Sequence, residues 1–170
     1  MKPKLVYVLT IVSMFIASNA MAKDLALRLG LGFNSQIGLA ERLDSASVRY
    51  WLNKDMGIQG DFAFLNFSPE HGSSQTSFGL GGKFLYNLIQ ETNMNFYIGG
   101  GLNVFTQPDP VDTETGFGLY GLSGIEFFFQ GLPNLGFDLE LDLGLRYLHD
   151  YGTAFGISGD SINAGFHYYF

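Results

Sequence analysis

Three carboxylates at alternate positions are the residues best placed to do chemistry in this sequence. Asp138, Glu140 and Asp142 lie in the run FDLELDLGLRYL, residues 137–148. Side chains two positions apart point to the same face of an extended chain, so these three could hold a cation or act as an acid/base pair. The pleat of a strand imposes the same spacing whatever the side chains do. We interpret them as charges lining the inside of a barrel, and we predict no catalytic residue, no metal and no cofactor.

The run around these carboxylates alternates throughout, which identifies the element that carries them. Phe137, Leu139 and Leu141 begin an apolar face opposite the carboxylates, and a period of two residues predicts a strand. Its length suits a tilted strand across the hydrocarbon core of a bilayer, which takes about 9–11 residues. The same pattern recurs along the chain and predicts eight strands, with a loop at 149–160 before the last: 25–34, 48–52, 56–65, 78–88, 96–104, 117–129, 137–148 and 161–170.

The volume of a small barrel decides which face of these strands points inward. An eight-stranded barrel has an interior only just wide enough for side chains, and the apolar face carries Leu, Ile and Phe on every strand. We predict that this face points outward and that the face rich in glycine, alanine and asparagine lines the lumen, together with His167. Buried charges need partners, and those of the lumen face nearly balance: Arg28, Arg49, Lys83 and Arg146 against Asp61, Glu126, Asp138, Glu140 and Asp142.

The beginning of the chain is typical of a cleavable signal peptide. Two lysines precede an apolar segment at 5–17, and Ala20-Met21-Ala22 fits the small-residue pattern of a cleavage site. We predict a signal peptide at 1–22 and a single barrel domain at 23–170. Removal of the two lysines leaves seven basic residues against 16 acidic ones. The sequence has no cysteine, which excludes disulfides and thiol nucleophiles.

Aromatic residues and loop lengths favour an orientation across a membrane. Aromatic side chains gather at both rims of the predicted barrel, as membrane-facing girdles do. The turns at one rim are short and the loops at the other are longer and polar, which is typical of periplasmic turns and extracellular loops. Solvation alone explains the acidic charge of these loops, and the alternative is that they bind divalent cations or a basic surface ligand. The loop charges are Glu41, Asp44, Glu70, Asp109, Asp112, Glu114, Asp150 and Asp160 against Arg42 alone.

The last strand carries the most specific pattern in the chain. Phe166, Tyr168 and the C-terminal Phe170 alternate on one face. With this ending, the chain resembles the small eight-stranded outer-membrane barrels of Gram-negative bacteria, of the OmpX and OmpA transmembrane-domain type. The resemblance implies an all-β fold, an antiparallel up-and-down transmembrane barrel located in the bacterial outer membrane. It also implies that these three residues form the assembly signal read by the barrel-assembly machinery.

Three kinds of function fit a barrel of this type. We favour a structural or surface-interaction protein with a side-chain-filled lumen, surrounded by outer-membrane lipid and lipopolysaccharide and without a nucleic acid partner. A narrow pore is one alternative. The other is a lipid A deacylase, because enzymes of that type are also eight-stranded barrels, with a His-x-Ser pair near the outer rim. His149 has the matching position, but Tyr151 stands in place of the serine, which argues against an enzyme.

Overall fold

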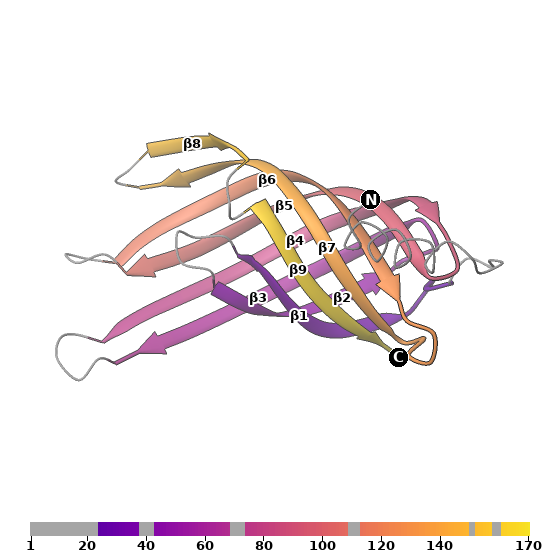
Figure 1. The fold of residues 1–170 in the computed structure, drawn as a ribbon. Helices are drawn as coiled ribbons and strands as arrows, with labels where there is room; N and C mark the ends of the chain where they lie inside the picture. Colours follow the sequence, from indigo (N-terminus) through magenta and orange to yellow (C-terminus); the bar gives the residue numbers. More distant parts are fainter. Residues whose placement is uncertain (1–23, 38–42, 69–73, 109–112, 150–151, 158–160) are drawn as a thin grey trace, which may run out of the picture.

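The computed structural model describes residues 24–37, 43–68, 74–108, 113–149, 152–157 and 161–170, so the predicted signal peptide lies outside it. No helix in these segments is long and apolar enough to cross a membrane. The described segments form nine β-strands (Figure 1): β1 (Leu29–Ile37), β2 (Leu43–Trp51), β3 (Met56–Phe67), β4 (Gln75–Gln90), β5 (Met94–Pro108), β6 (Thr113–Phe128), β7 (Leu135–Leu148), β8 (Gly152–Gly156) and β9 (Ile162–Tyr169).

Eight of these strands close into one antiparallel barrel. Strands β1 to β7 pair in chain order, and β9 pairs with both β7 and β1, so the sheet returns to its first strand. Figure 1 shows the tilted strands wrapping around a common axis. The end that carries the turns at 52–55, 91–93 and 129–134 is called the short-turn end below, and the opposite end the long-loop end. The predicted all-β, eight-stranded antiparallel fold is confirmed.

The short strand β8 departs from the prediction. It pairs with Gly144–Leu148 at the outer part of β7, whereas β9 pairs with Leu135–Leu141 of the same strand. Both strands therefore lie along the same edge of β7, one beyond the other, and β8 with the end of β7 forms a hairpin at the upper left of Figure 1. The prediction of a loop at 149–160 is wrong for Gly152–Gly156, where the backbone continues the antiparallel ladder.

The first two strands also begin elsewhere than the alternation predicts. β1 starts at Leu29 and not at Leu25, because Leu27 has a positive φ of 61° and the chain turns there. The turn places Leu25 inside the barrel, 3% exposed, where it packs in the apolar cluster of the short-turn end. β2 starts at Leu43, well before the predicted 48. Its polar beginning is a strand because Ser47 and its neighbours pair with both β1 and β3.

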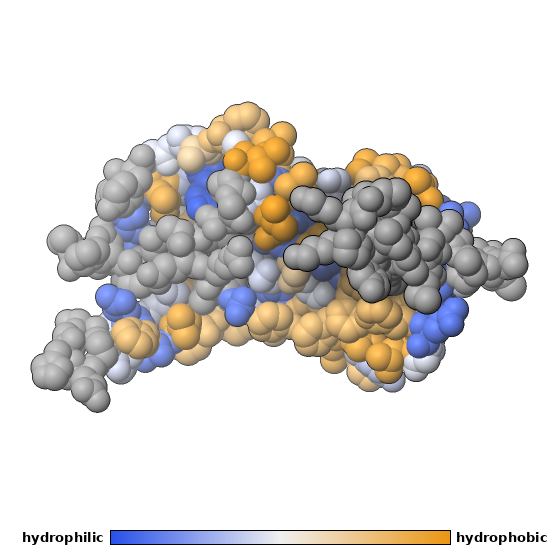
Figure 2. Space-filling model, viewed as in Figure 1, coloured by the Kyte–Doolittle hydropathy of each residue, from blue (hydrophilic) through white to orange (hydrophobic). Residues whose placement is uncertain are grey.

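The outer wall of the barrel is apolar on every strand. The four outward leucines of β7, from Leu139 to Leu145, are 44–47% exposed, and large apolar side chains are similarly exposed on the other strands. The lower wall in Figure 2 is a continuous orange band, with blue residues at its left and right ends. The structure therefore places the apolar face outside and the polar face inside.

Aromatic rings contact one another near both ends of this wall. Toward the short-turn end, Phe127, Phe129 and Phe137 of β6, the following turn and β7 form a cluster with ring centroids 5.5–5.7 Å apart. Toward the long-loop end, the centroids of Phe117 and Tyr147 lie 5.3 Å apart. The rings thus bracket the aliphatic part of β6 and β7.

Large aromatic side chains fill the lumen by lying over glycines of the neighbouring strand. Tyr97 of β5 lies directly opposite Gly124 of β6, where an added Cβ would lie 2.6 Å from the tyrosine ring. That distance is shorter than side-chain packing allows, so the ring and a larger residue cannot share the site. The same directly opposite pairing recurs around the barrel: Tyr169 with Gly30, Trp51 with Gly57, Tyr120 with Gly101 and Phe105 with Gly116.

Candidate functional site

A network of buried charged side chains crosses the lumen, with Arg49 of β2 at its centre. The guanidinium is fully buried and contacts three carboxylates. Nη1 lies 3.2 Å from Glu126 Oε1, and Nη2 lies 3.2 Å from Glu140 Oε1 and 3.5 Å from Asp138 Oδ1. Nε donates a hydrogen bond of 2.7 Å to Gln59 Oε1. Arginine suits this position because its planar fork presents several donors at once.

Glu140 connects the arginine to a second buried cation. Its Oε2 accepts a hydrogen bond of 2.9 Å from Lys83 Nζ, and its Oε1 accepts one of 2.6 Å from the Tyr97 hydroxyl. Lys83 Nζ lies 3.8 Å from Asp61 Oδ2, and Asp61 Oδ1 accepts a hydrogen bond of 2.8 Å from Gln59 Nε2. The network is therefore continuous through the barrel from β2, β3 and β4 to β7.

His167 and Tyr169 join the network from β9. His167 Nδ1 lies 3.0 Å from Asp138 Oδ1, and Nε2 lies 2.8 Å from Ser47 Oγ. The Tyr169 hydroxyl donates a hydrogen bond of 2.6 Å to Glu126 Oε1. The side chains of His167, Tyr169 and their partners Asp138, Ser47 and Glu126 are all buried. Alternation along β9 places the histidine and the tyrosine on the lumen face together.

Two of the predicted lumen charges, Arg28 and Arg146, lie apart from this network, and Asp142 lies beside Glu140 and Lys83. Arg28 is half-buried at the short-turn end, where its Nε donates to the carbonyl oxygen of Phe170 at 3.2 Å. Asp142 accepts a hydrogen bond of 2.9 Å from Asn163 Nδ2. Arg146 is half-buried and forms no ion pair with any residue that the structure describes. The structure brings together the other six: Arg49, Asp61, Lys83, Glu126, Asp138 and Glu140.

The charges of this network do not balance. Its four carboxylates face two cations, Arg49 and Lys83. With the carboxylates ionised and His167 neutral, the network carries two excess negative charges. The sequence predicts near balance only by counting Arg28 and Arg146, which lie toward opposite ends of the barrel.

An apolar cluster closes the lumen on the short-turn side of the network. Trp51 and Tyr169 pack there with Leu25 and other buried apolar residues, and Trp51 Nε1 donates to the Tyr169 hydroxyl at 3.3 Å. The hydroxyl of Tyr169 thereby links the apolar cluster to Glu126. An aromatic layer and a charged layer thus fill this part of the barrel, and a second buried apolar cluster contains Phe105 and Ala63.

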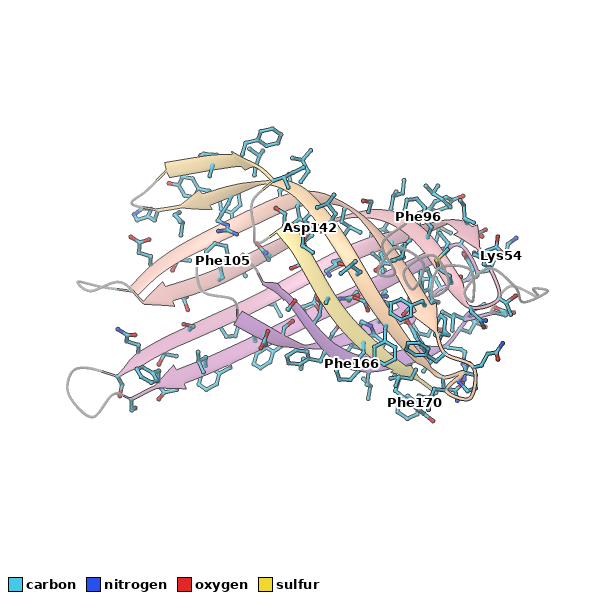
Figure 3. The ribbon with its side chains drawn as sticks, in the orientation of Figure 1. Lys54, Phe96, Phe105, Asp142, Phe166 and Phe170 are labelled. Atoms are coloured by element: carbon cyan, nitrogen blue, oxygen red, sulfur yellow. The ribbon has the colours of Figure 1, made fainter. Side chains whose placement is uncertain are left out.

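The residues of the predicted assembly signal lie on the outside of the last strand. Phe166, Tyr168 and Phe170 are 43%, 47% and 66% exposed. Figure 3 shows Phe166 and Phe170 on the outer side of the wall, away from the lumen. The rings of Tyr168 and Phe170 contact each other, with centroids 5.1 Å apart.

The acidic loop residues lie mostly outside the described part of the chain. Asp44 is exposed near the start of β2, and Glu114 is buried near the start of β6. The other loop charges fall on residues that are not described: Glu41, Arg42, Glu70, Asp109, Asp112, Asp150 and Asp160.

Gln59 and Ser47 are parts of the network that the sequence analysis does not single out. Gln59 bridges Arg49 and Asp61, and Ser47 contacts His167. Alternation along the strand predicts that both face the lumen, since each lies two positions from a charged residue on the same strand face. It does not predict their contacts, because the partners lie on other strands.

His149 directly follows β7 and is exposed, and its backbone N–H donates to the Thr115 carbonyl oxygen at 3.3 Å. Tyr151, which occupies the serine position of the deacylase pattern, lies outside the described residues.

No protein-family model and no curated protein matches this sequence.

Proposed function

We propose that this chain is an integral protein of the bacterial outer membrane, where the barrel spans the bilayer and serves a structural or surface-interaction role. One observation carries the proposal, the inverted polarity of the barrel. Its outward leucines on β7 are 44–47% exposed, while Arg49 and Glu126 inside are fully buried. A continuous apolar wall of this size is costly in water, and a bilayer buries it in hydrocarbon.

Export and assembly follow from the same proposal. A signal peptide at 1–22 would direct the chain across the inner membrane. The outward aromatic face of β9 would then be offered to the barrel-assembly machinery, and the aromatic rings near both ends of the wall would sit at headgroup level among lipid and lipopolysaccharide.

The contents of the lumen favour a structural role over a narrow pore. Ion pairs cross the lumen from Arg49 to β6 and β7 and from Lys83 to β3 and β7. Conduction would require these contacts to open, and breaking a buried ion pair leaves an uncompensated charge. A surface ligand would meet the acidic loops of the long-loop end, and the net charge of −7 disfavours nucleic acid as that ligand.

Cell fractionation of the full chain, expressed in a Gram-negative host, tests this proposal. We expect the protein in the outer-membrane fraction after an alkaline wash, with a mature N-terminus at Lys23 by mass spectrometry. Recovery of the protein in the soluble periplasmic or cytoplasmic fraction would contradict the proposal. A chain that stays in the inner membrane with residues 1–22 attached would contradict its export.

A further inference from the structure

Two acidic side chains lie directly opposite each other inside the barrel. Glu126 of β6 and Asp138 of β7 are register partners, and both are buried, at 0% and 3% exposure. Like charges at directly opposite positions destabilise a pair of strands. Arg49 contacts one oxygen of each, Glu126 Oε1 and Asp138 Oδ1, and so compensates only part of this repulsion.

Within the described part of the chain, the second oxygen of each carboxylate lacks a hydrogen-bond donor. Glu126 Oε2 and Asp138 Oδ2 are buried and accept no hydrogen bond from any residue that the structure describes. A buried carboxylate oxygen without a donor or a cation is unfavourable. These two acceptors therefore point to a positively charged ligand of the network beyond Arg49.

His167 completes a ligand set with these carboxylates. One potential ligand atom from each of Glu126, Asp138 and His167 lies within 4.8 Å of the other two. Donor atoms bound tetrahedrally to one ion at about 2.0–2.2 Å lie about 3.3–3.6 Å apart, so the three side chains must draw together by up to about 1.5 Å when the ion binds. Ser47 Oγ, 2.8 Å from Nε2, can accept a hydrogen bond from an Nε2–H, and in that tautomer the Nδ1 lone pair is on the side of Asp138 and can bind an ion.

We propose that Glu126, Asp138 and His167 bind one divalent transition-metal ion inside the barrel. The charge of the network supports such an ion, because its ion-paired carboxylates outnumber Arg49 and Lys83 by two. One imidazole nitrogen with carboxylate oxygens is a ligand set that Zn²⁺ and related ions accept, whereas Ca²⁺ and Mg²⁺ prefer oxygen alone.

The glycine opposite Asp138 keeps space for this ligand set. Gly165 of β9 is the register partner of Asp138, and a Cβ added there would lie 2.8 Å from Asp138 Oδ2, the oxygen without a partner. Any larger residue at this position would push against the carboxylate. The site lies within the barrel, so the inference does not depend on the membrane location proposed above.

Refolding with zinc tests the proposal, because a site this deeply buried is best loaded while the barrel forms. The chain is refolded from urea into detergent micelles with either Zn²⁺ or a chelator, dialysed, and analysed for metal by mass spectrometry. We expect about one Zn²⁺ per chain for the wild type. His167→Gln and Glu126→Gln should each lower the retained zinc at least tenfold, and Ser47→Ala should weaken binding about 10–100-fold.

His149→Gln is the matched control, because it removes an exposed histidine outside the network. It should retain zinc as the wild type does. Absence of zinc from the refolded wild type would overturn the proposal, as would equal zinc in the wild type and His167→Gln. Loss of zinc in His149→Gln alone would move the site to the long-loop end and also overturn it.

X-ray absorption at the zinc edge keeps the proposal testable if His167→Gln fails to fold. In the wild type we expect one imidazole ligand with the remaining ligands oxygen, at about 2.0–2.2 Å. A spectrum with two or more imidazoles would require His149 or His71 as a ligand and would contradict the site. A spectrum with oxygen ligands alone would contradict it as well.

Discussion

Glu140 is the side chain that both buried cations of the barrel share. Its two oxygens contact Arg49, Lys83 and the Tyr97 hydroxyl, at 3.2, 2.9 and 2.6 Å. Arg49 has two other carboxylates, whereas the second ion pair of Lys83 within the described segments is the longer one with Asp61, at 3.8 Å. Removal of Glu140 therefore affects Lys83 most, because it takes away the nearer of the two carboxylates that pair with this ammonium.

We expect Glu140→Ala to lower the free energy of unfolding by about 3–5 kcal/mol, the usual cost of breaking a buried ion pair from one side. Glu140→Gln should cost less, because it keeps the volume and an oxygen that accepts from Tyr97 or Lys83. Urea titrations in lipid vesicles, followed by tryptophan fluorescence of the single Trp51, measure both. If both variants lowered the free energy of unfolding by the same small amount, water would reach these charges.

Leu141 tests the opposite face of β7 at the same depth. It is 44% exposed on the outer wall, one residue from Glu140. We expect Leu141→Arg to cost about 2–4 kcal/mol if the wall lies in hydrocarbon, and Leu141→Phe to be mild because it keeps the wall apolar. The same vesicle titrations compare the two. If arginine is tolerated as well as phenylalanine, this wall does not face lipid.

The sequence predicts which side of the strand these residues face, but it does not predict which residues they contact. Alternation along β7 places Glu140 inside and Leu141 outside without any structure. The contacts of Glu140 come from β2, β4 and β5, and those depend on the tilt and register of strands far apart in the chain. For the same reason the counted charges appear balanced in the sequence, although Arg28 and Arg146 lie away from the centre.

Neighbouring strands fit together through aromatic rings packed over glycines, in addition to the alternation of apolar and polar residues. Gly124→Ala on β6 should cost about 1–3 kcal/mol, the range for overpacking a tight interior, because the new Cβ would lie 2.6 Å from the Tyr97 ring. Gly121→Ala on the same strand is the control, since its added Cβ meets nothing nearer than 3.9 Å. We expect a change within about 0.5 kcal/mol for the control. Similar losses for both glycines in vesicle titrations would mean that strand propensity, not the ring, dominates.

The strand ends show where sequence patterns stop being informative. Leu25, Leu27 and Leu29 continue one alternating series, yet the backbone turns at Leu27 and puts Leu25 in the lumen. The turn closes the short-turn end, and only tertiary packing against that apolar cluster reveals it. β8 escapes prediction for a related reason: its five residues are too few for a periodic pattern, and their structure comes from pairing with β7.

At the scale of the whole molecule, a lumen filled by apolar and charged side chains should not conduct ions steadily. An eight-stranded barrel has little interior space beyond its side chains, and the charged layer is cross-linked by ion pairs. In planar bilayers we expect no sustained channel from the wild type and brief small openings from Glu140→Ala. A stable ohmic channel from the wild type would show a continuous water path and would favour the narrow pore.

The barrel should fold with its apolar wall in a membrane and its charges inside. Gel migration of the membrane-extracted protein, with and without boiling in detergent, shows whether it does. We expect the unboiled protein to migrate faster than the boiled one, because a closed barrel stays compact in detergent while heat unfolds it. Identical migration of both samples, together with recovery of the protein without detergent, would mean that the chain does not form a membrane barrel.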